Sequence, residues 1–264
     1  MKKVVAYAAG VPSPHKNEQK VLILKNFIEG VSAKGDNGIL YKGKVVDTTA
    51  DLAVIQGWVH SGSPNTPHLV LRKNVFEKSK NTIIVDSNLF LYADSGNSNQ
   101  FLRYSYDGVF PSTGEYCNAD SDPARWTLLS NKLGIKLKPW RKSGTNILIC
   151  CQRDGGWSMG GEALMPWLVR TIQQLRKHSD RKIIVRFHPG DKNTLNHKRM
   201  MARYRLANVI ISHSESILQD FAEAYCVVNL NSSPTIAAAI EGIPTINIFE
   251  YGLKMKRKSK MYEY

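Results

Sequence analysis

The sequence predicts an α/β protein with two mostly parallel β-sheets, each covered by helices. Short apolar runs of strand length alternate with helix-length segments along the chain. Turns rich in glycine, serine or proline follow several of these runs. A hydrophobic fraction of 42% over 264 residues supplies a real core, in one large domain or two of ordinary size.

The first half is expected to have the order β-α-β-β-α-β, which is typical of a mostly parallel sheet. Its strands are predicted at residues 3–9, 39–46, 52–55 and 82–85. Apolar residues at helical spacing predict a helix at 18–33, and a second helix ends at Lys78. We expect structured, tyrosine-rich loops over 87–116 and a helix at 123–133.

The second half alternates more regularly and predicts a doubly wound sheet. Strands are expected near residues 146–151, 183–187, 208–211, 226–230 and 244–248. Helices are expected near residues 162–178, 192–205, 214–224 and 234–241. The segment before them, 134–144, is polar, basic and broken by Pro139, so we place the domain boundary there, between 1–138 and 139–264.

Three loops of the second half are expected to meet at one edge of its sheet. They have the sequences CCQRDGGW at 150–157, RFHPGD at 186–191 and NLNSSPTIAAAIEG at 229–242. Each begins where a predicted parallel strand ends, and ligands of open parallel sheets bind at that edge. A strand followed by a glycine-rich turn and a helix start also directs backbone N–H groups at an anion.

Composition narrows the class of protein. The formal charge of +14 favours a polyanionic partner such as nucleic acid or a phosphorylated substrate, or else indicates a generally basic protein. The four cysteines lack metal-ligand spacing and are expected to be reduced. No apolar run approaches the ~20 residues of a membrane span, and no signal peptide is evident. We therefore expect a cytoplasmic protein, monomeric or weakly dimeric.

Four stretches resemble those of tailed-phage glycosyltransferases with the GT-B fold. They are YSYDGVFPSTGEY at 104–116, QRDGGW at 152–157, HPGD at 188–191, and NSSP at 231–234 with EG at 241–242. Such enzymes are similar to capsule-type transferases and to phage enzymes that glycosylate hydroxymethylated DNA bases. The resemblance implies two Rossmann-like domains, an acceptor domain over 1–138 and a nucleotide-sugar domain over 139–264. Such chains usually continue further, so we expect a truncated or divergent C-terminal end with a basic run at 254–260.

The resemblance and the three loops together predict a donor site in the second domain. The residues expected there are Gln152, Arg153, Gly155, Gly156, Arg186, His188, Gly190, Ser232, Ser233 and Glu241. Arginine neutralises phosphate bidentately, and small hydroxyl residues let the backbone approach it. Ordinary alternatives stay open: Arg153 can be a solvated loop residue, His188 a structural histidine, and Ser233 only a helix cap.

Glu241 is the least regular member of this set. It lies in the last turn of a predicted helix, where the helix dipole disfavours a carboxylate, so a cation or a ligand hydroxyl should hold it. In the family that the chain resembles, the ribose-binding glutamate lies near the start of this helix, where this chain has Ile236, Ala237 and Ala238.

An inverting transfer needs a general base, which we expect in the first domain. Asp107 is the first choice, followed by Asp86 and Glu115, with His15 and Asp94 as further candidates. The resemblance implies that no bound metal is needed for catalysis.

The predicted function is sugar transfer from a nucleotide-sugar, foremost a UDP-sugar, to a hydroxymethylated base of double-stranded phage DNA in the host cytoplasm. Such a base must be flipped out of the duplex, and basic residues near the domain boundary would then contact its backbone: Lys136, Lys138, Arg141 and Lys142. Three alternatives stay open. They are glycosyl or glycerophosphate transfer to a surface polysaccharide, a sugar-nucleotide epimerase, and a non-catalytic nucleic-acid-binding protein.

Overall fold

The computed structural model describes residues 1–12, 18–57, 65–93, 100–109, 114–117, 119–155, 159 and 162–248. The described chain divides into two compact units between Thr127 and Leu128, within helix α3 (Pro123–Leu133). The boundary expected at 138/139 lies in the extended segment after this helix. His15, Asp94, Gly156 and the basic run at 254–260 lie outside the described residues.

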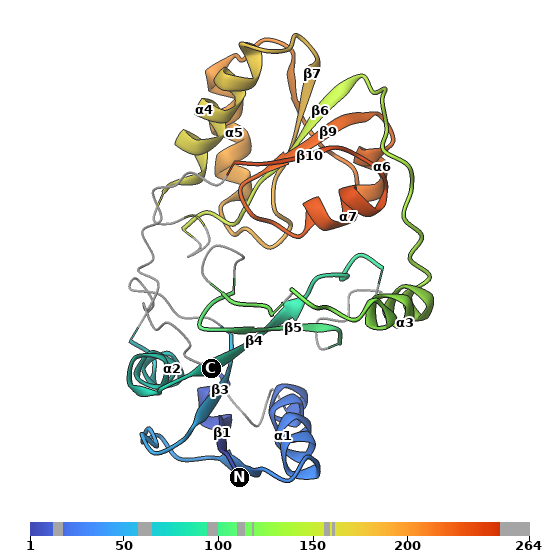
Figure 1. Ribbon diagram of the computed structural model, residues 1–264. Helices are drawn as coiled ribbons and strands as arrows, with labels where there is room; N and C mark the ends of the chain where they lie inside the picture. Colours follow the sequence, from blue (N-terminus) through green and yellow to red (C-terminus); the bar gives the residue numbers. More distant parts are fainter. Residues whose placement is uncertain are drawn as a thin grey trace. The chain divides into compact units, whose positions relative to one another are not determined.

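The first unit contains a five-stranded sheet in the order β2-β1-β3-β4-β5. Its strands are β1 (Lys3–Tyr7), β2 (Asn37–Tyr41), β3 (Leu52–Gln56), β4 (Thr82–Asn88) and β5 (Leu102–Tyr106). The first four are parallel, and β5 pairs antiparallel with β4. The turn η1 (Ala8–Gly10) follows β1, and helices α1 (Glu18–Ala33) and α2 (Pro67–Lys78) cover opposite faces of the sheet (Figure 1).

Strand β5 is an element that the sequence did not predict. Hydrophobic alternation is the usual signal of a half-buried strand. In β5 the only fully buried residue is Ser105, whereas Tyr104 is exposed, so the signal is missing. The tyrosine-rich segment was therefore expected to be loop, while the predicted β-α-β-β-α-β order before it is confirmed.

The second unit contains a five-stranded, fully parallel sheet in the order β10-β9-β6-β7-β8. Its strands are β6 (Asn146–Cys150), β7 (Lys182–Arg186), β8 (Val209–Ile211), β9 (Ala224–Asn229) and β10 (Thr245–Asn247). Helices α4 (Leu164–Arg176) and α5 (Thr194–Tyr204) cover one face, and α6 (Ile217–Phe221) and α7 (Pro234–Ile240) cover the other (Figure 1). The predicted doubly wound α/β class is confirmed.

Burial explains why these strands were readable in the sequence. Every residue of β6 is buried, because helices cover both of its faces, and such strands form continuous apolar runs. Trp167, Leu168 and Ile172 of α4 pack in the same core as Ile149 and Val185. The core is therefore continuous from the first helix across the centre of the sheet.

The cysteines are free thiols, three of them buried and Cys117 exposed. Burial raises the pKa of Cys150 to about 12, so this thiol stays protonated and unreactive at neutral pH. Within the ranges described above, no helix combines the length and apolar content needed to cross a bilayer.

In both units the strand order reverses beside the first strand. The chain runs from β6 to β7 and β8, and then returns to β9 on the other side of β6. The first unit repeats this with β1, β2 and β3. In open α/β sheets the crevice at the carboxyl ends of the two strands flanking such a reversal is where ligands bind.

Candidate functional site

The loops that follow β6, β7 and β9 meet at the carboxyl edge of the second sheet. Strand β6 lies between the other two strands, so its loop lies between theirs. The amide nitrogen of Gln152 donates a hydrogen bond to the side-chain oxygen of Asn231, in the loop after β9. On the other side, Arg153 reaches the loop after β7 and lies against Gly190. The structure therefore brings the three predicted loops together.

Gly190 and His188 form the wall on which Arg153 rests. A Cβ atom on residue 190 would lie 2.6 Å from a terminal guanidinium nitrogen of Arg153, so this approach requires a residue without a side chain. The backbone N–H of Gly190 donates to Nδ1 of His188 at 2.9 Å. In the neutral imidazole this leaves the proton on Nε2, which can donate to a ligand.

Partial burial lowers the pKa of His188 below its ordinary value, and the positive charge of Arg153 lowers it further. The imidazole is thus neutral at pH 7 in the free protein. Two donors of different kind stand side by side at this edge, a permanent cation on Arg153 and a neutral N–H on His188.

Buried polar groups fix the turn that carries Ser232 and Ser233. Asn229 is fully buried at the end of β9, and its amide nitrogen donates to the carbonyl of Ser232 at 3.0 Å and to Thr235 Oγ1 at 3.2 Å. Thr235 Oγ1 also donates to the carbonyl of Ser232, at 2.6 Å. Ser233 occupies the N-cap position of α7, but its exposed side chain makes no capping hydrogen bond. Its hydroxyl is therefore not used for capping.

His197 is a residue of this edge that the sequence did not single out. It is almost fully buried in α5 and stacks on Phe187. Its Nε2 lies 3.3 Å from Asp154 Oδ2, and its Nδ1 lies 3.0 Å from Asp191 Oδ2, in an orientation that forms no hydrogen bond. Asp154 also accepts the N–H of Leu164 at 2.9 Å, chiefly for which its pKa is lowered. His197 therefore joins the loops that carry Arg153 and His188.

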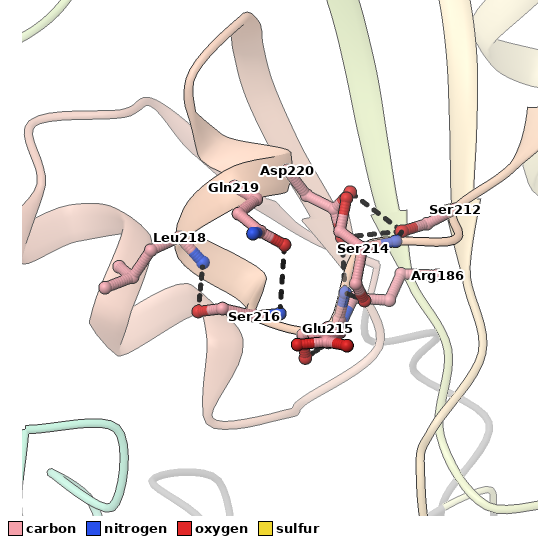
Figure 2. Close-up of polar contacts among 8 residues, drawn as sticks. All are labelled: Arg186, Ser212, Ser214, Glu215, Ser216, Leu218, Gln219 and Asp220. Atoms are coloured by element: carbon pink, nitrogen blue, oxygen red, sulfur yellow. Dashed lines mark hydrogen bonds and ion pairs between the residues drawn. The ribbon is translucent and has the colours of Figure 1, made fainter.

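Arg186, predicted as a phosphate ligand, has partners within the protein (Figure 2). Its Nη1 lies 2.6 Å from Asp220 Oδ2 and donates to the carbonyl of Ser214 at 2.9 Å, while Nη2 donates to the carbonyl of Glu215 at 3.0 Å. Ser212 Oγ completes the group by donating to the Asp220 carboxylate at 2.7 Å. The guanidinium thus ties β7 to the start of α6.

Glu241 lies at the opposite edge of the sheet from this cluster. It is the C-cap of α7, whose seven residues carry it about 10 Å away from Ser233. The cation that holds its carboxylate is Lys138. Ribose binding by Glu241 beside Arg153 and His188 does not fit this position, so that expectation is corrected.

Two of the basic boundary residues are fixed at the same opposite edge. The backbone N–H of Lys138 donates to Ile240 O at 3.0 Å, and that of Arg141 donates to Gly242 O at 2.6 Å. The Arg141 guanidinium donates to the carbonyl of Phe221 at 2.6 Å, among others of this region. These two residues fasten the extended segment to the second unit, and the placement expected for them near the donor loops is wrong.

The three described general-base candidates lie at different edges of the first sheet. Asp86 lies near the carboxyl end of β4 and forms an ion pair with Arg103. Asp107 follows antiparallel β5, so it lies beside Thr82 at the start of β4, where its Oδ1 accepts the Thr82 N–H at 3.2 Å. Glu115 bridges to Tyr106 at that same amino edge. Of the three, only Asp86 is on the side where parallel sheets bind ligands.

The positive charge is concentrated in the second unit. Residues 128–254 contain 18 lysines and arginines against nine aspartates and glutamates, whereas residues 1–127 contain 14 against 12. A polyanion is therefore attracted mainly to the second unit. Among the described residues, no group of three or more His, Cys, Asp or Glu side chains is placed to hold a metal ion.

No protein-family model and no curated protein sequence matches this chain. Two solved structures of KpsC from Thermosulfurimonas dismutans, a beta Kdo 2,4 transferase and a beta Kdo 2,7 transferase, are similar to it, with TM-scores of 0.53 and 0.50. Each is 13% identical; the matches cover 93% and 92% of this chain and 79% and 78% of those chains. A UDP-GlcNAc 2-epimerase from Methanocaldococcus jannaschii, 12% identical over 90% of this chain and 68% of its own, has a TM-score of 0.33, too low to support an argument. The first two likenesses show the fold, which is of the GT-B type with two Rossmann-like domains.

Proposed function

We propose that this chain is a nucleotide-sugar-dependent glycosyltransferase whose donor binds at the carboxyl edge of the second sheet. One observation carries the proposal: Gln152 and Arg153 join the loops after β6, β7 and β9 at the crevice where this fold binds ligands. The fold itself, shared with two solved transferases, agrees with that chemistry.

The donor edge offers groups suited to the phosphates of a nucleotide-sugar. Arg153 supplies a permanent positive charge, His188 supplies its Nε2 proton, and Ser233 supplies an unused hydroxyl. When the bond between the sugar and the phosphate oxygen breaks, negative charge grows on the departing phosphate. Donors aimed at that charge lower the barrier, because they stabilise the transition state more than the ground state.

The acceptor hydroxyl must lose a proton as its oxygen bonds to the sugar carbon. We assign this proton to Asp86, because it is the described carboxylate among the candidates that lies at the carboxyl edge of the first sheet. Arg103 holds its carboxylate in place. Asp107 and Glu115 lie at the amino edge and are better explained as parts of the β4–β5 pairing.

A hydroxymethylated base in duplex DNA is one candidate acceptor. The formal charge of +14 and its concentration in the second unit support it, because phosphate contacts from lysine and arginine dominate DNA affinity. A saccharide is the second candidate. It is supported by the two similar structures, both of which are named as Kdo transferases.

Calorimetric titration with UDP-, GDP-, CDP- and CMP-sugars tests the donor site. We expect one class to bind the wild-type chain and to bind Arg153→Met at least roughly ten-fold more weakly, as loss of a charge-assisted contact implies. Arg170→Met is the matched control, because Arg170 pairs with Glu162 on the exposed side of α4. Failure of every nucleotide-sugar to bind would exclude the proposal and favour a non-catalytic, nucleic-acid-binding chain.

Transfer assays with the bound donor then separate the acceptors. Incorporation of labelled sugar into hydroxymethylcytosine DNA selects the DNA acceptor, and incorporation into oligosaccharide alone selects the saccharide. Conversion of the nucleotide-sugar without any acceptor selects an epimerase.

A further inference from the structure

Arg72 is a buried cation of the first unit that lacks a carboxylate partner among the described residues. The residue is 8% exposed, and its Nε donates to the carbonyl of Gly10 at 2.6 Å. Burial lowers the pKa of the guanidinium to about 10, which leaves it charged at neutral pH. An ion without a counter-ion is costly to bury, so an anion from outside the described chain is expected at this position.

Arg72 lies at the strand reversal of the first sheet. Its side chain runs from Gly10, in the turn after β1, to Gly57, the residue that follows β3. A Cβ on residue 57 would lie 2.7 Å from Nη1 of Arg72, and Gly57 has a φ of +82°, so glycine is required there on both counts. The guanidinium therefore occupies the position at which open α/β sheets bind ligands.

A cavity of about 920 Å³ adjoins this position. Its wall includes residues of the same turn and the same helix as the neighbours of Arg72, together with lysines: Ala8, Val11, Lys25, Lys42, Lys44 and His68. Lys25 pairs with Glu29, whereas Lys42 and Lys44 are exposed and form no ion pair with a described carboxylate. His68 precedes Arg72 by one helical turn, and burial and then the charge of Arg72 lower its pKa, so its imidazole is neutral.

The walls of the cavity indicate what kind of molecule fits. Its volume is that of a small-molecule site. Proteins that hold flipped or unpaired bases stack them on aromatic side chains, and no Phe, Tyr or Trp is among the described residues that line it. Aliphatic and cationic groups line it instead, which suits a sugar or polyol that carries a negative charge.

We propose that the crevice between β1 and β3 binds a phosphate or carboxylate group of a non-aromatic acceptor, with Arg72 as the buried counter-ion and Lys42 and Lys44 at the rim. The role of this ligand as acceptor rests on the proposed glycosyltransferase function. The anion site itself rests only on Arg72, the two glycines and the cavity.

Titration of the full chain with inorganic phosphate tests the site, in an Arg153→Met background that weakens phosphate binding at the donor edge. We expect phosphate to bind this background, and Arg72→Met to weaken that binding at least ten-fold. The Lys42→Ala/Lys44→Ala variant is expected to weaken it about three-fold. Lys73→Met is the control, because Lys73 neighbours Arg72 in α2 but is exposed and near Glu77. Equal affinity in Arg72→Met and Lys73→Met, or no phosphate binding in the background, overturns the proposal.

Folding is not expected to obscure the result, because replacing a buried unpaired charge by an apolar side chain is often neutral or stabilising. If Arg72→Met does not fold, the double lysine variant decides, and unchanged phosphate affinity in it counts against the site. Nucleotide-sugar affinity, measured in parallel with Arg153 intact, is expected to be the same in Arg72→Met as in wild type. A chain that binds no nucleotide-sugar but still binds phosphate through Arg72 refutes the proposed function and leaves the site standing. Loss of duplex-DNA binding in Arg72→Met, with phosphate affinity unchanged, assigns the residue to a nucleic acid and overturns the non-aromatic acceptor.

Discussion

The guanidinium of Arg153 lies directly against the backbone of Gly190, although the two residues belong to loops of different strands. Strands β6 and β7 are parallel neighbours, so their carboxyl ends are adjacent and their loops compete for the same space. Glycine at 190 leaves room for the arginine. This contact fixes a positive charge beside His188 and is the basis of the first prediction.

Gly190→Ala is expected to move Arg153 while leaving the fold intact. The new Cβ would lie 2.6 Å from the end of a flexible side chain, so the free energy of unfolding should fall by less than about 1 kcal/mol. Nucleotide-sugar affinity should fall roughly ten-fold, because a charge-assisted contact is displaced. Calorimetry and urea unfolding measure the two effects.

Gly30→Ala is the control for this substitution. Gly30 lies within α1, and a Cβ there meets nothing within 4 Å. Alanine should raise stability by about 0.5–1 kcal/mol and leave donor affinity unchanged. Unchanged donor affinity in Gly190→Ala as well would show that the position of Arg153 does not matter for binding.

His188 should give the free protein a pH-dependent contribution to stability. Its pKa is lower in the folded chain than the usual 6.5, so between 6.5 and the folded pKa the unfolded state binds more protons. Stability that is present above pH 6.5 is therefore lost as the pH falls through this window. His188→Gln should lose less stability between pH 7.5 and pH 5, as measured by urea unfolding at each pH.

Donor binding should show the opposite dependence on pH. A phosphate beside His188 favours the charged imidazolium and raises its pKa, so binding takes up a proton. Nucleotide-sugar affinity should therefore rise as the pH falls through about 6.5, and this rise should be absent in His188→Gln. An identical pH profile for wild type and His188→Gln would remove His188 from the donor site.

Arg186→Met should destabilise the second unit rather than abolish donor binding directly. The Asp220 side chain is 3% exposed, and breaking a buried pair at one partner costs about 3–5 kcal/mol. Arg186→Met/Asp220→Leu should recover most of that loss, since no unpaired charge is left. A ten-fold loss of donor affinity at unchanged stability would instead show that Arg186 binds phosphate.

His197→Phe should loosen two loops at once. The ring can still stack on Phe187, but the contacts to Asp154 and Asp191 are lost, and the Asp191 carboxylate is almost fully buried. We expect a loss of about 1–3 kcal/mol in the free energy of unfolding. Nucleotide-sugar affinity should fall as well. Hydrogen exchange should be faster at Arg153 and His188 than in wild type, and unchanged exchange there would rule out the joining role.

The sequence predicted the sheets well because buried parallel strands are continuous apolar runs, as β6 is. It also located the three loops, since the edge rule needs only strand order and not side-chain contacts. It could not assign Arg186 and Glu241, because their partners, Asp220 and Lys138, lie 34 and 103 residues away in the chain. His197 had no local signature, since one histidine in an amphipathic helix is common.

Asp107 illustrates a different limit. Its place depends on β5 being a strand that runs antiparallel to β4, and the tyrosine-rich segment has no alternation to reveal this. Reversing one strand moves its end to the other edge of the sheet. The first-choice base was therefore expected at the wrong edge, and Asp86 takes that position.

A crystal structure of the full chain with the nucleotide-sugar that binds most tightly is the most direct test of the donor pocket. We expect both phosphates at the carboxyl edge of the second sheet, with phosphate oxygens about 2.7–3.2 Å from the Arg153 guanidinium, His188 Nε2 and Ser233 Oγ. An ordered nucleotide whose phosphates contact none of these three side chains would contradict the assignment.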